Sequence, residues 1–187
     1  MMITKEEILN ALPEIGEVEN PQWREACLAV WAEAAGMSCW ERLADAPNNL
    51  DVPEDSLVRH TRGVYAGAFA LAEAMQKSQN VDINRDKLRV ICLLHDVCKL
   101  VELERDQRGH HKSRRGEEFP HGYFSCHLCM KHGLPEDIAA AILSHSQFIK
   151  NTPACIEGIL QFYADLADAD VCKFMHNSPL LIGYCKI

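Results

Sequence analysis

The stretch RVICLLHDVCKLVELE, residues 89–104, is apolar along most of its length yet carries His95, Asp96 and Lys99 in its middle. Its apolar spacing predicts one continuous core helix over residues 84–103. Burying an imidazole, a carboxylate and an ammonium without partners would cost several kcal/mol. The stretch therefore predicts that other polar or charged groups meet these three side chains inside the fold.

The composition indicates an ordinary soluble globular protein. A chain of 187 residues with 48% hydrophobic and 25% charged residues can build one domain with a sizeable core. A formal net charge of −8 argues against a surface built for membranes or for nucleic acid in general, although a local basic patch stays open. No apolar run reaches the roughly 18 residues that span a bilayer. The first residues lack the order of a secretory signal, and the nine cysteines follow no disulfide framework. We therefore expect reduced thiols and a cytoplasmic location.

Apolar residues recur at steps of three and four along nearly the whole chain, which predicts an all-α protein. Ser56 or Asp55 is placed to cap one helix, and Gly133 is placed to end another. Residues 41–56 and the polar stretch up to about residue 118 are expected to be loops. The predicted helices cover residues 5–12, 21–35, 56–76, 84–103, 121–133, 135–149 and 153–174.

Several histidines and aspartates interrupt these apolar helices. One histidine on an apolar helix is more often a hydrogen-bonded core residue than a metal ligand, but a set of such groups on five helices is harder to explain in that way. Imidazole and carboxylate together suit Mn, Fe, Co, Ni or Zn, and a helical bundle can bring them to its axis. The set consists of His60, His95, Asp96, His121, His145 and Asp165.

The position of Lys99 adds a second prediction. On a continuous helix, Lys99 lies four residues after His95 and three after Asp96, so the three side chains share one face. An ammonium would repel a metal ion directly, unless an anion such as a phosphate lies between them. We therefore expect a metal on one side of this helix and a phosphate beside Lys99.

The ordered set resembles the HD-domain superfamily of metal-dependent phosphohydrolases, over residues 57 to about 174. LLHDVCKLVELE, SLVRHTRGV and FYADLADADVCKF are similar to the HD domain of 3′–5′ exoribonucleases. PHGYFSC, LSHS and ADLAD are similar to HD-type dinucleoside polyphosphate hydrolases. The resemblance implies a helical bundle with a metal site between helices at residues 51–187. Residues 1–50 are then expected to form a helical extension packed on the same domain.

The resemblance also implies residue roles. The six histidines and aspartates would hold two divalent transition metal ions, with Asp96 bridging them and Lys99 contacting a phosphate oxygen. In such a centre the metals lower the pKa of a bridging water, and hydroxide attacks the phosphorus. Asp168 and Asp170 compete with Asp165 for the last ligand position. Asp165 is favoured because it follows QFYA and lies on the apolar face of the predicted helix. Asp168 could instead accept a hydrogen bond from a histidine that binds the metal.

Residues 105–115 contain five Lys or Arg and one acidic residue. This segment joins the stretch that carries Lys99 to His121, so it could close over an anionic substrate. The other interpretation is a solvated loop, and the sequence leaves both open. The candidate substrate-binding residues are Lys99, Arg108, Lys112 and Arg114.

The resulting hypothesis is a metal-dependent phosphohydrolase that cleaves a phosphomonoester or phosphodiester bond of a nucleotide or related small phosphoester. One alternative is a di-iron HD-type oxygenase acting on a small organic substrate, because its ligand set is the same. Another is a non-catalytic module that binds a nucleotide and regulates a partner. Lys99 favours phosphate chemistry, and the complete set of ligands favours a catalyst.

Overall fold

The computed structural model describes residues 3–145 and 151–184, and helices dominate it, which confirms the all-α prediction. Residues 146–149 of the helix predicted from Pro135 lie outside the described residues. Among those described, no helix is both long and apolar enough to cross a membrane. The helices are α1 Lys5–Ala11, α2 Pro21–Gly36, α3 Leu57–Gln79, α4 Arg85–Leu94, α5 Lys99–Glu102, α6 Arg114–Glu118, α7 His121–Lys131, α8 Glu136–Leu143 and α9 Ile156–Met175, and the strands are β1 Leu103–Asp106 and β2 Gly109–Lys112.

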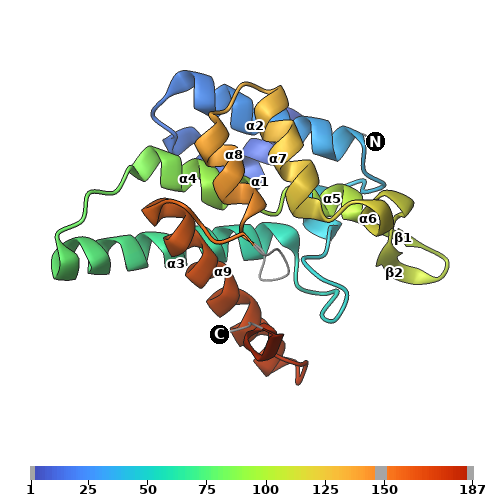
Figure 1. Ribbon diagram of the computed structural model, residues 1–187. Coiled ribbons are helices and arrows are strands. Elements are labelled where there is room, and N and C mark those ends of the chain that lie inside the picture. The colour runs from blue at the N-terminus through green and yellow to red at the C-terminus, as the bar shows by residue number, and fades with distance from the viewer. Residues whose placement is uncertain (1–2, 146–150, 185–187) are drawn as a thin grey trace.

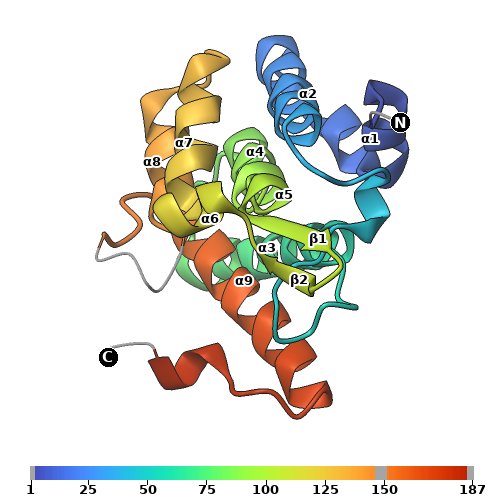
Figure 2. The same ribbon diagram turned by 90° about the vertical axis from the view of Figure 1, so that its right-hand side faces the viewer.

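Helix α4 occupies the middle of the molecule (Figures 1 and 2). It packs against α2, α3, α8 and α9, while α3 and α9 also pack against each other. A helix that is apolar on most of its sides belongs in a protein core, and nearly all of α4 beyond its first turn is buried. The C-terminal end of α4 therefore delivers the residues that follow it to the centre of the fold. Its buried residues are Leu88, Val90, Ile91, Cys92, Leu93 and Leu94.

The prediction of one continuous helix over residues 84–103 is wrong at His95 and Asp96. Helix α4 ends at Leu94, residues 95–98 form a turn, and α5 begins at Lys99. Within the turn, backbone N–H groups donate hydrogen bonds to the carbonyl three residues earlier instead of four. Lys99 N, for example, donates to Asp96 O at 2.9 Å. The apolar spacing survives this change of pitch, so the sequence pattern does not reveal the break.

Trp31 ties α2 to the end of α4. Its side chain is fully buried, and its Nε1 donates to the Leu93 carbonyl at 3.0 Å. The last carbonyls of a helix lack a partner within the helix, so this bond satisfies a buried acceptor two residues before His95. Helix α2 thereby helps to position the turn that carries the polar residues.

Residues 103–112 form an antiparallel hairpin rather than the predicted loop. Leu103 pairs with Lys112, and Asp106 pairs with Gly109, which has a left-handed φ of 92°. Each strand has only four residues and β2 has no alternation of buried and exposed positions, so the sequence carried no strand signal. The hairpin lies at the edge of the molecule beside α6, at the right in Figure 1.

Two predicted helix boundaries are confirmed. Ser56 rather than Asp55 caps α3, because its side chain accepts from Arg59 N at 3.2 Å. Gly133 follows α7 with a φ of 79°, and Leu134 N donates back to Cys129 O. That pair of features is the usual glycine-terminated end of a helix.

Replacing Trp31 should test its link to α4. We expect Trp31→Ala to lower the free energy of unfolding by about 3–5 kcal/mol because it leaves a large cavity. Trp31→Phe should cost about 1–3 kcal/mol because the Leu93 carbonyl loses its donor. Urea unfolding measures both. Trp23, which is only partly buried on the same helix, provides the control, and an equal loss in Trp23→Ala would contradict the assignment.

Candidate metal centre

The fold brings the six histidines and aspartates together at the end of α4. The sequence pattern placed all six on helices, but only two of them lie in the interior of a helix. His60 and Asp165 lie within α3 and α9, whereas the other four occupy helix ends or turns. The four are His95 and Asp96 between α4 and α5, His121 at the first residue of α7, and His145 just after α8.

One group of donor atoms gathers around Asp96 Oδ2. His60 Nε2 lies 3.2 Å from this oxygen and 3.2 Å from Asp165 Oδ1. His95 Nε2 lies 3.4 Å from Asp96 Oδ2 and 3.4 Å from His60 Nε2. One donor atom from each of the four residues lies within 4.8 Å of the others, a spacing that could hold a metal ion.

A second group gathers around the other oxygen of the same carboxylate. His121 Nε2 lies 3.1 Å and His145 Nε2 lies 3.2 Å from Asp96 Oδ1. The two imidazole nitrogens are 3.2 Å apart. These three residues also present donor atoms within 4.8 Å of one another. Asp96 therefore belongs to both groups, with one oxygen in each.

Asp96 is the residue that needs a cation most. It is 2% exposed, and neither of its carboxylate oxygens has a well-aligned hydrogen bond among the described residues. Burial alone would raise the pKa of Asp96, but Lys99, His95 and His121 outweigh it and hold that pKa well below the usual value. A buried carboxylate that stays ionised is normally paired or bound to a metal. The residues present thus fit a divalent metal centre.

Two of the histidines are oriented by backbone carbonyls. His95 Nδ1 lies 2.8 Å from Cys92 O, and His145 Nδ1 lies 2.5 Å from Ile142 O. A hydrogen on Nδ1 leaves Nε2 with its lone pair free to bind a metal. Both Nε2 atoms point toward Asp96.

The other two histidines are oriented by carboxylates. His60 Nδ1 lies 2.6 Å from Asp168 Oδ2, and His121 Nδ1 lies 2.5 Å from Glu102 Oε2. Burial would lower the pKa of His121, but Asp96 and Glu102 outweigh it and raise that pKa to about 9. A carboxylate behind a histidine also makes it a more basic metal ligand.

Lys99 lies beside the shared carboxylate. Its Nζ is 2.7 Å from Asp96 Oδ2 and donates to Asn48 Oδ1 at 2.8 Å. Burial would lower the pKa of Lys99, but the charges of Asp96 and Asp165 outweigh it and raise that pKa. The side chain is 16% exposed, so Lys99 is not fully enclosed by the cluster.

The sequence profile of the HD domain matches residues 57–170. The chain belongs to the HD-domain family. All six clustered residues and Lys99 lie inside the matched region, whereas Asn48 precedes it.

A curated relative is the dihydroneopterin 2′,3′-cyclic phosphate phosphodiesterase of Methanocaldococcus jannaschii. It is 26% identical over 119 residues, which cover 63% of this chain and 48% of the relative. This HD protein therefore aligns with about half the length of that relative. No solved structure gave a significant match.

The three aspartates of α9 have different places in this HD domain. Asp165 lies in the cluster, and Asp168 lies behind His60. Asp170 accepts from the backbone N–H groups of Leu181 and Ile182, at 2.5 and 3.1 Å, and thus fixes the segment after α9.

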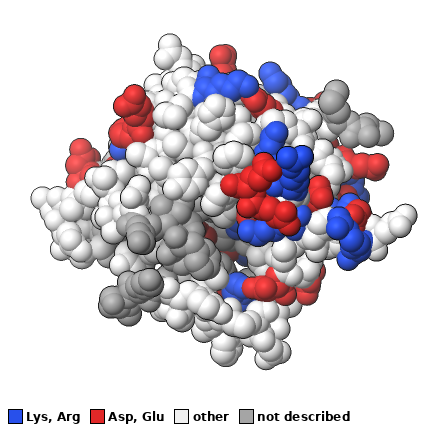
Figure 3. All heavy atoms as spheres, turned by 45° about the vertical axis from the view of Figure 1, so that its right-hand side comes forward, with Lys and Arg blue, Asp and Glu red and all other residues white. Residues whose placement is uncertain are grey.

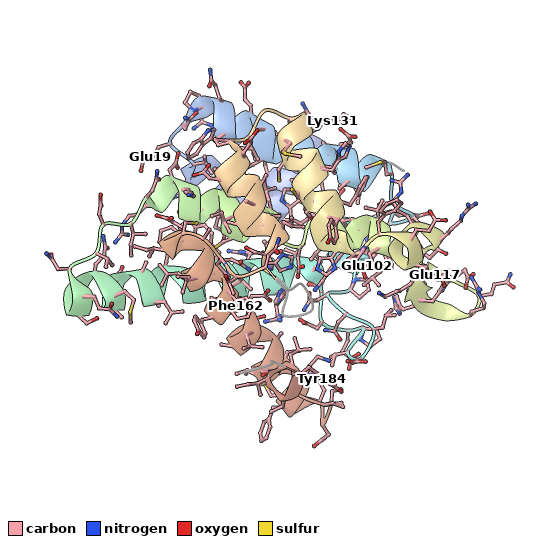
Figure 4. All side chains as sticks on the ribbon, viewed as in Figure 1. Glu19, Glu102, Glu117, Lys131, Phe162 and Tyr184 are labelled. Carbon is pink, nitrogen blue, oxygen red and sulfur yellow. The ribbon has the colours of Figure 1, made fainter. Side chains whose placement is uncertain are left out.

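Glu102 is a site residue that the sequence reasoning missed. It is buried at the end of α5, where Figure 4 shows it near the middle of the molecule, in contrast to Glu117 toward the hairpin. Besides His121 it pairs with Lys112, whose Nζ lies 3.0 Å from Glu102 Oε1. A carboxylate within the otherwise apolar stretch LVEL was the available signal, but its partner is 19 residues away.

The basic segment of this HD domain is largely paired. Arg108 pairs with Asp106 at the tip of the hairpin, and Arg114 pairs with Glu118 in α6. Acidic and basic side chains accordingly lie interspersed on the face seen in Figure 3. Of the candidate substrate-binding residues in this segment, Lys112 comes nearest to the centre, through Glu102.

Gly63 offers a test of the carboxylate behind His60. A Cβ added at Gly63 would lie 2.1 Å from Asp168 Oδ1, so Gly63→Ala must push this carboxylate away from His60. We expect metal affinity to fall by about 10–100-fold, as is usual when such an outer partner is lost. Calorimetric titration of the metal-free protein with Mn²⁺ measures this affinity.

Gly67→Ala is the matched control for Gly63→Ala. It lies one turn further along α3, and its added Cβ would meet Ala164 Cβ at an ordinary contact of 3.4 Å. Equal metal affinities in the two variants would contradict the role given to Asp168.

Proposed function

We propose that the protein is a metal-dependent phosphohydrolase that cleaves a phosphoester bond of a small phosphorylated compound, with nucleotides as the leading class. The observation that carries the proposal is the buried Asp96, whose two oxygens face two separate groups of metal-binding atoms beside the ammonium of Lys99. Membership of the HD-domain family and the phosphodiesterase relative support the same reaction class.

The proposed centre holds two divalent transition metal ions. One set of ligands is His60, His95, Asp165 and Asp96 Oδ2, and the other is His121, His145 and Asp96 Oδ1. Donors of this kind accept Mn, Fe, Co, Ni or Zn. When bound, such ions supply Lewis acidity and allow a water molecule to lose a proton near neutral pH.

The residues of the chain itself would bind and orient the substrate. Lys99 places a compact positive charge at the partly exposed edge of the cluster, where it can hold a phosphoryl oxygen as negative charge develops there. Lys112 is half exposed and pairs with Glu102, so it could bind a second anionic group. Glu102 and Asp168 keep His121 and His60 in the orientation that the centre needs.

The name of the relative indicates which candidate substrate should be assayed first. Its name gives a 2′,3′-cyclic phosphate as the compound on which it acts. Since the alignment covers less than half of that relative, the pterin part of the name carries less weight here than the cyclic phosphodiester. We therefore place nucleoside 2′,3′-cyclic phosphates first among the candidates.

The test combines metal analysis with turnover on one preparation. We expect about two transition metal ions per chain and hydrolysis of at least one member of a panel. The panel consists of a nucleoside 2′,3′-cyclic phosphate, a 5′-mononucleotide and a dinucleoside polyphosphate. Chelator should abolish turnover. Asp96→Ala should lower it by more than about 100-fold, because losing even an outer partner of a ligand costs about 10–100-fold.

Asp137→Ala serves as the control for Asp96→Ala. Asp137 is an exposed carboxylate on α8 that pairs with Lys87, and its loss should leave both metal content and turnover unchanged. A preparation with two ions per chain that hydrolyses no phosphoester of the panel would contradict the proposed function.

A further inference from the structure

Residues 47–56 precede the region matched by the HD-domain family, yet they reach the metal centre. Asn48 is 2% exposed, and its Oδ1 accepts a hydrogen bond from Lys99 Nζ at 2.8 Å. Pro47 and Ser56 form an isolated antiparallel bridge that closes this segment into a loop. The loop therefore carries a buried polar side chain aimed at the Lys99 ammonium beside Asp96.

Asp55 fixes the position and orientation of the Asn48 amide. Asn48 N donates to Asp55 O at 2.7 Å, and Asn48 Nδ2 donates to Asp55 Oδ2 at 3.2 Å. A flipped amide would set its oxygen against the carboxylate and its NH₂ group against the ammonium of Lys99. Only the observed orientation gives each amide atom a partner of the right kind.

Asparagine meets both requirements of this position. The side chain must accept from a cation on one side and donate to an anion on the other. Aspartate would set a second carboxylate against that of Asp55, and alanine would remove one hydrogen-bond partner from Lys99 and one from Asp55. The amide of Asn48 is therefore matched to Lys99 and Asp55 together.

The same carboxylate ties the loop to the metal ligands. Arg59 Nη2 donates to Asp55 Oδ2 at 2.9 Å and to Asp168 Oδ2 at 2.8 Å. Asp168 in turn lies 2.6 Å from His60 Nδ1. A continuous set of polar contacts thus connects Asn48 to His60, a proposed metal ligand. These contacts fix the position of the amide relative to the centre.

We propose that Asn48 is a positioning residue that holds the Lys99 ammonium for contact with the phosphoryl group of the substrate. An ammonium has three N–H donors, and among the described residues Lys99 has two partners, Asn48 and Asp96. The third donor is available to an incoming anion. Without Asn48 the flexible side chain would be held by its contact with Asp96 alone. This inference rests on the proposed function, since it assigns Lys99 to a phosphate.

The experiment uses the metal-loaded full chain and inorganic phosphate as the probe. We expect Asn48→Ala to weaken phosphate binding by about 10-fold, the usual effect of losing a hydrogen bond to a charged group. Metal ions per chain should stay as in the wild type. Calorimetry measures the phosphate affinity, and elemental analysis measures the metal content.

Asn49→Ala is the matched control within the loop. Asn49 Oδ1 accepts from Val52 N at 2.9 Å, so its bond stays within the loop. Phosphate affinity in this variant should stay within about twofold of the wild type. Equal losses of phosphate affinity in Asn48→Ala and Asn49→Ala would overturn the inference, because the effect would then belong to the loop as a whole.

A double-variant cycle tests whether Asn48 acts through Lys99. Lys99→Ala should weaken phosphate binding, and adding Asn48→Ala should cause no further loss. Additive losses would overturn the inference, because residues that act through one contact are not additive. A fall in metal content with Asn48→Ala would overturn it as well.

Asn48→Asp provides a second variant that keeps the side-chain size, and urea unfolding of both variants shows whether each one is folded. Its carboxylate would neutralise the ammonium of Lys99, so phosphate binding should fall at least as far as in Asn48→Ala. Wild-type affinity in Asn48→Asp would overturn the inference.

The two proposals fail in different ways. A wild-type enzyme that binds phosphate but hydrolyses no ester would contradict the proposed function alone, since binding still reports on Asn48. Hydrolysis by the wild type with unchanged phosphate binding in Asn48→Ala would contradict the Asn48 inference alone. A wild-type protein that neither binds phosphate nor hydrolyses an ester of the panel would contradict both.

Discussion

The buried carboxylate of Asp96 is the constraint on which the rest of the centre depends. An ionised carboxylate in a protein interior is costly unless cations and donors surround it. Here Lys99 and four imidazoles surround it, while neither of its oxygens receives a well-aligned hydrogen bond among the described residues. The surrounding helices therefore place positive or metal-binding groups at both oxygens, and this placement divides the centre into two halves.

Helix ends are what make this convergence possible. A side chain in the middle of a helix is directed by the helix face, whereas a residue at a helix end can turn its side chain into the space between helices. His121 begins α7, His145 follows α8, and the turn after α4 carries His95 and Asp96. Trp31 holds that turn from α2, so part of the chain before the family-matched region supports the geometry of the centre.

Polar contacts around the centre connect the proposed metal ligands to the proposed phosphate-binding residue. The carboxylates of Asp168 and Glu102 orient histidines, and Asp55 connects the Arg59–Asp168 pair to Asn48 and hence to the ammonium of Lys99. Buried polar networks of this kind rigidify a structure when each member is satisfied. The orientation of proposed metal ligands and that of the proposed phosphate-binding group thus depend on one connected set of contacts.

The sequence alone determined the helical class and singled out the six side chains that the fold brings together, because a charged or imidazole group within an apolar run is visible without knowing its partners. Apolar spacing reports which residues are buried but not the pitch of the backbone, so the break after Leu94 and the hairpin after Glu102 required the structure. The roles of Glu102 and Asn48 also required it, because their partners lie 19 and 51 residues away in the chain. Such pairings follow from how helices pack, which tertiary structure alone decides.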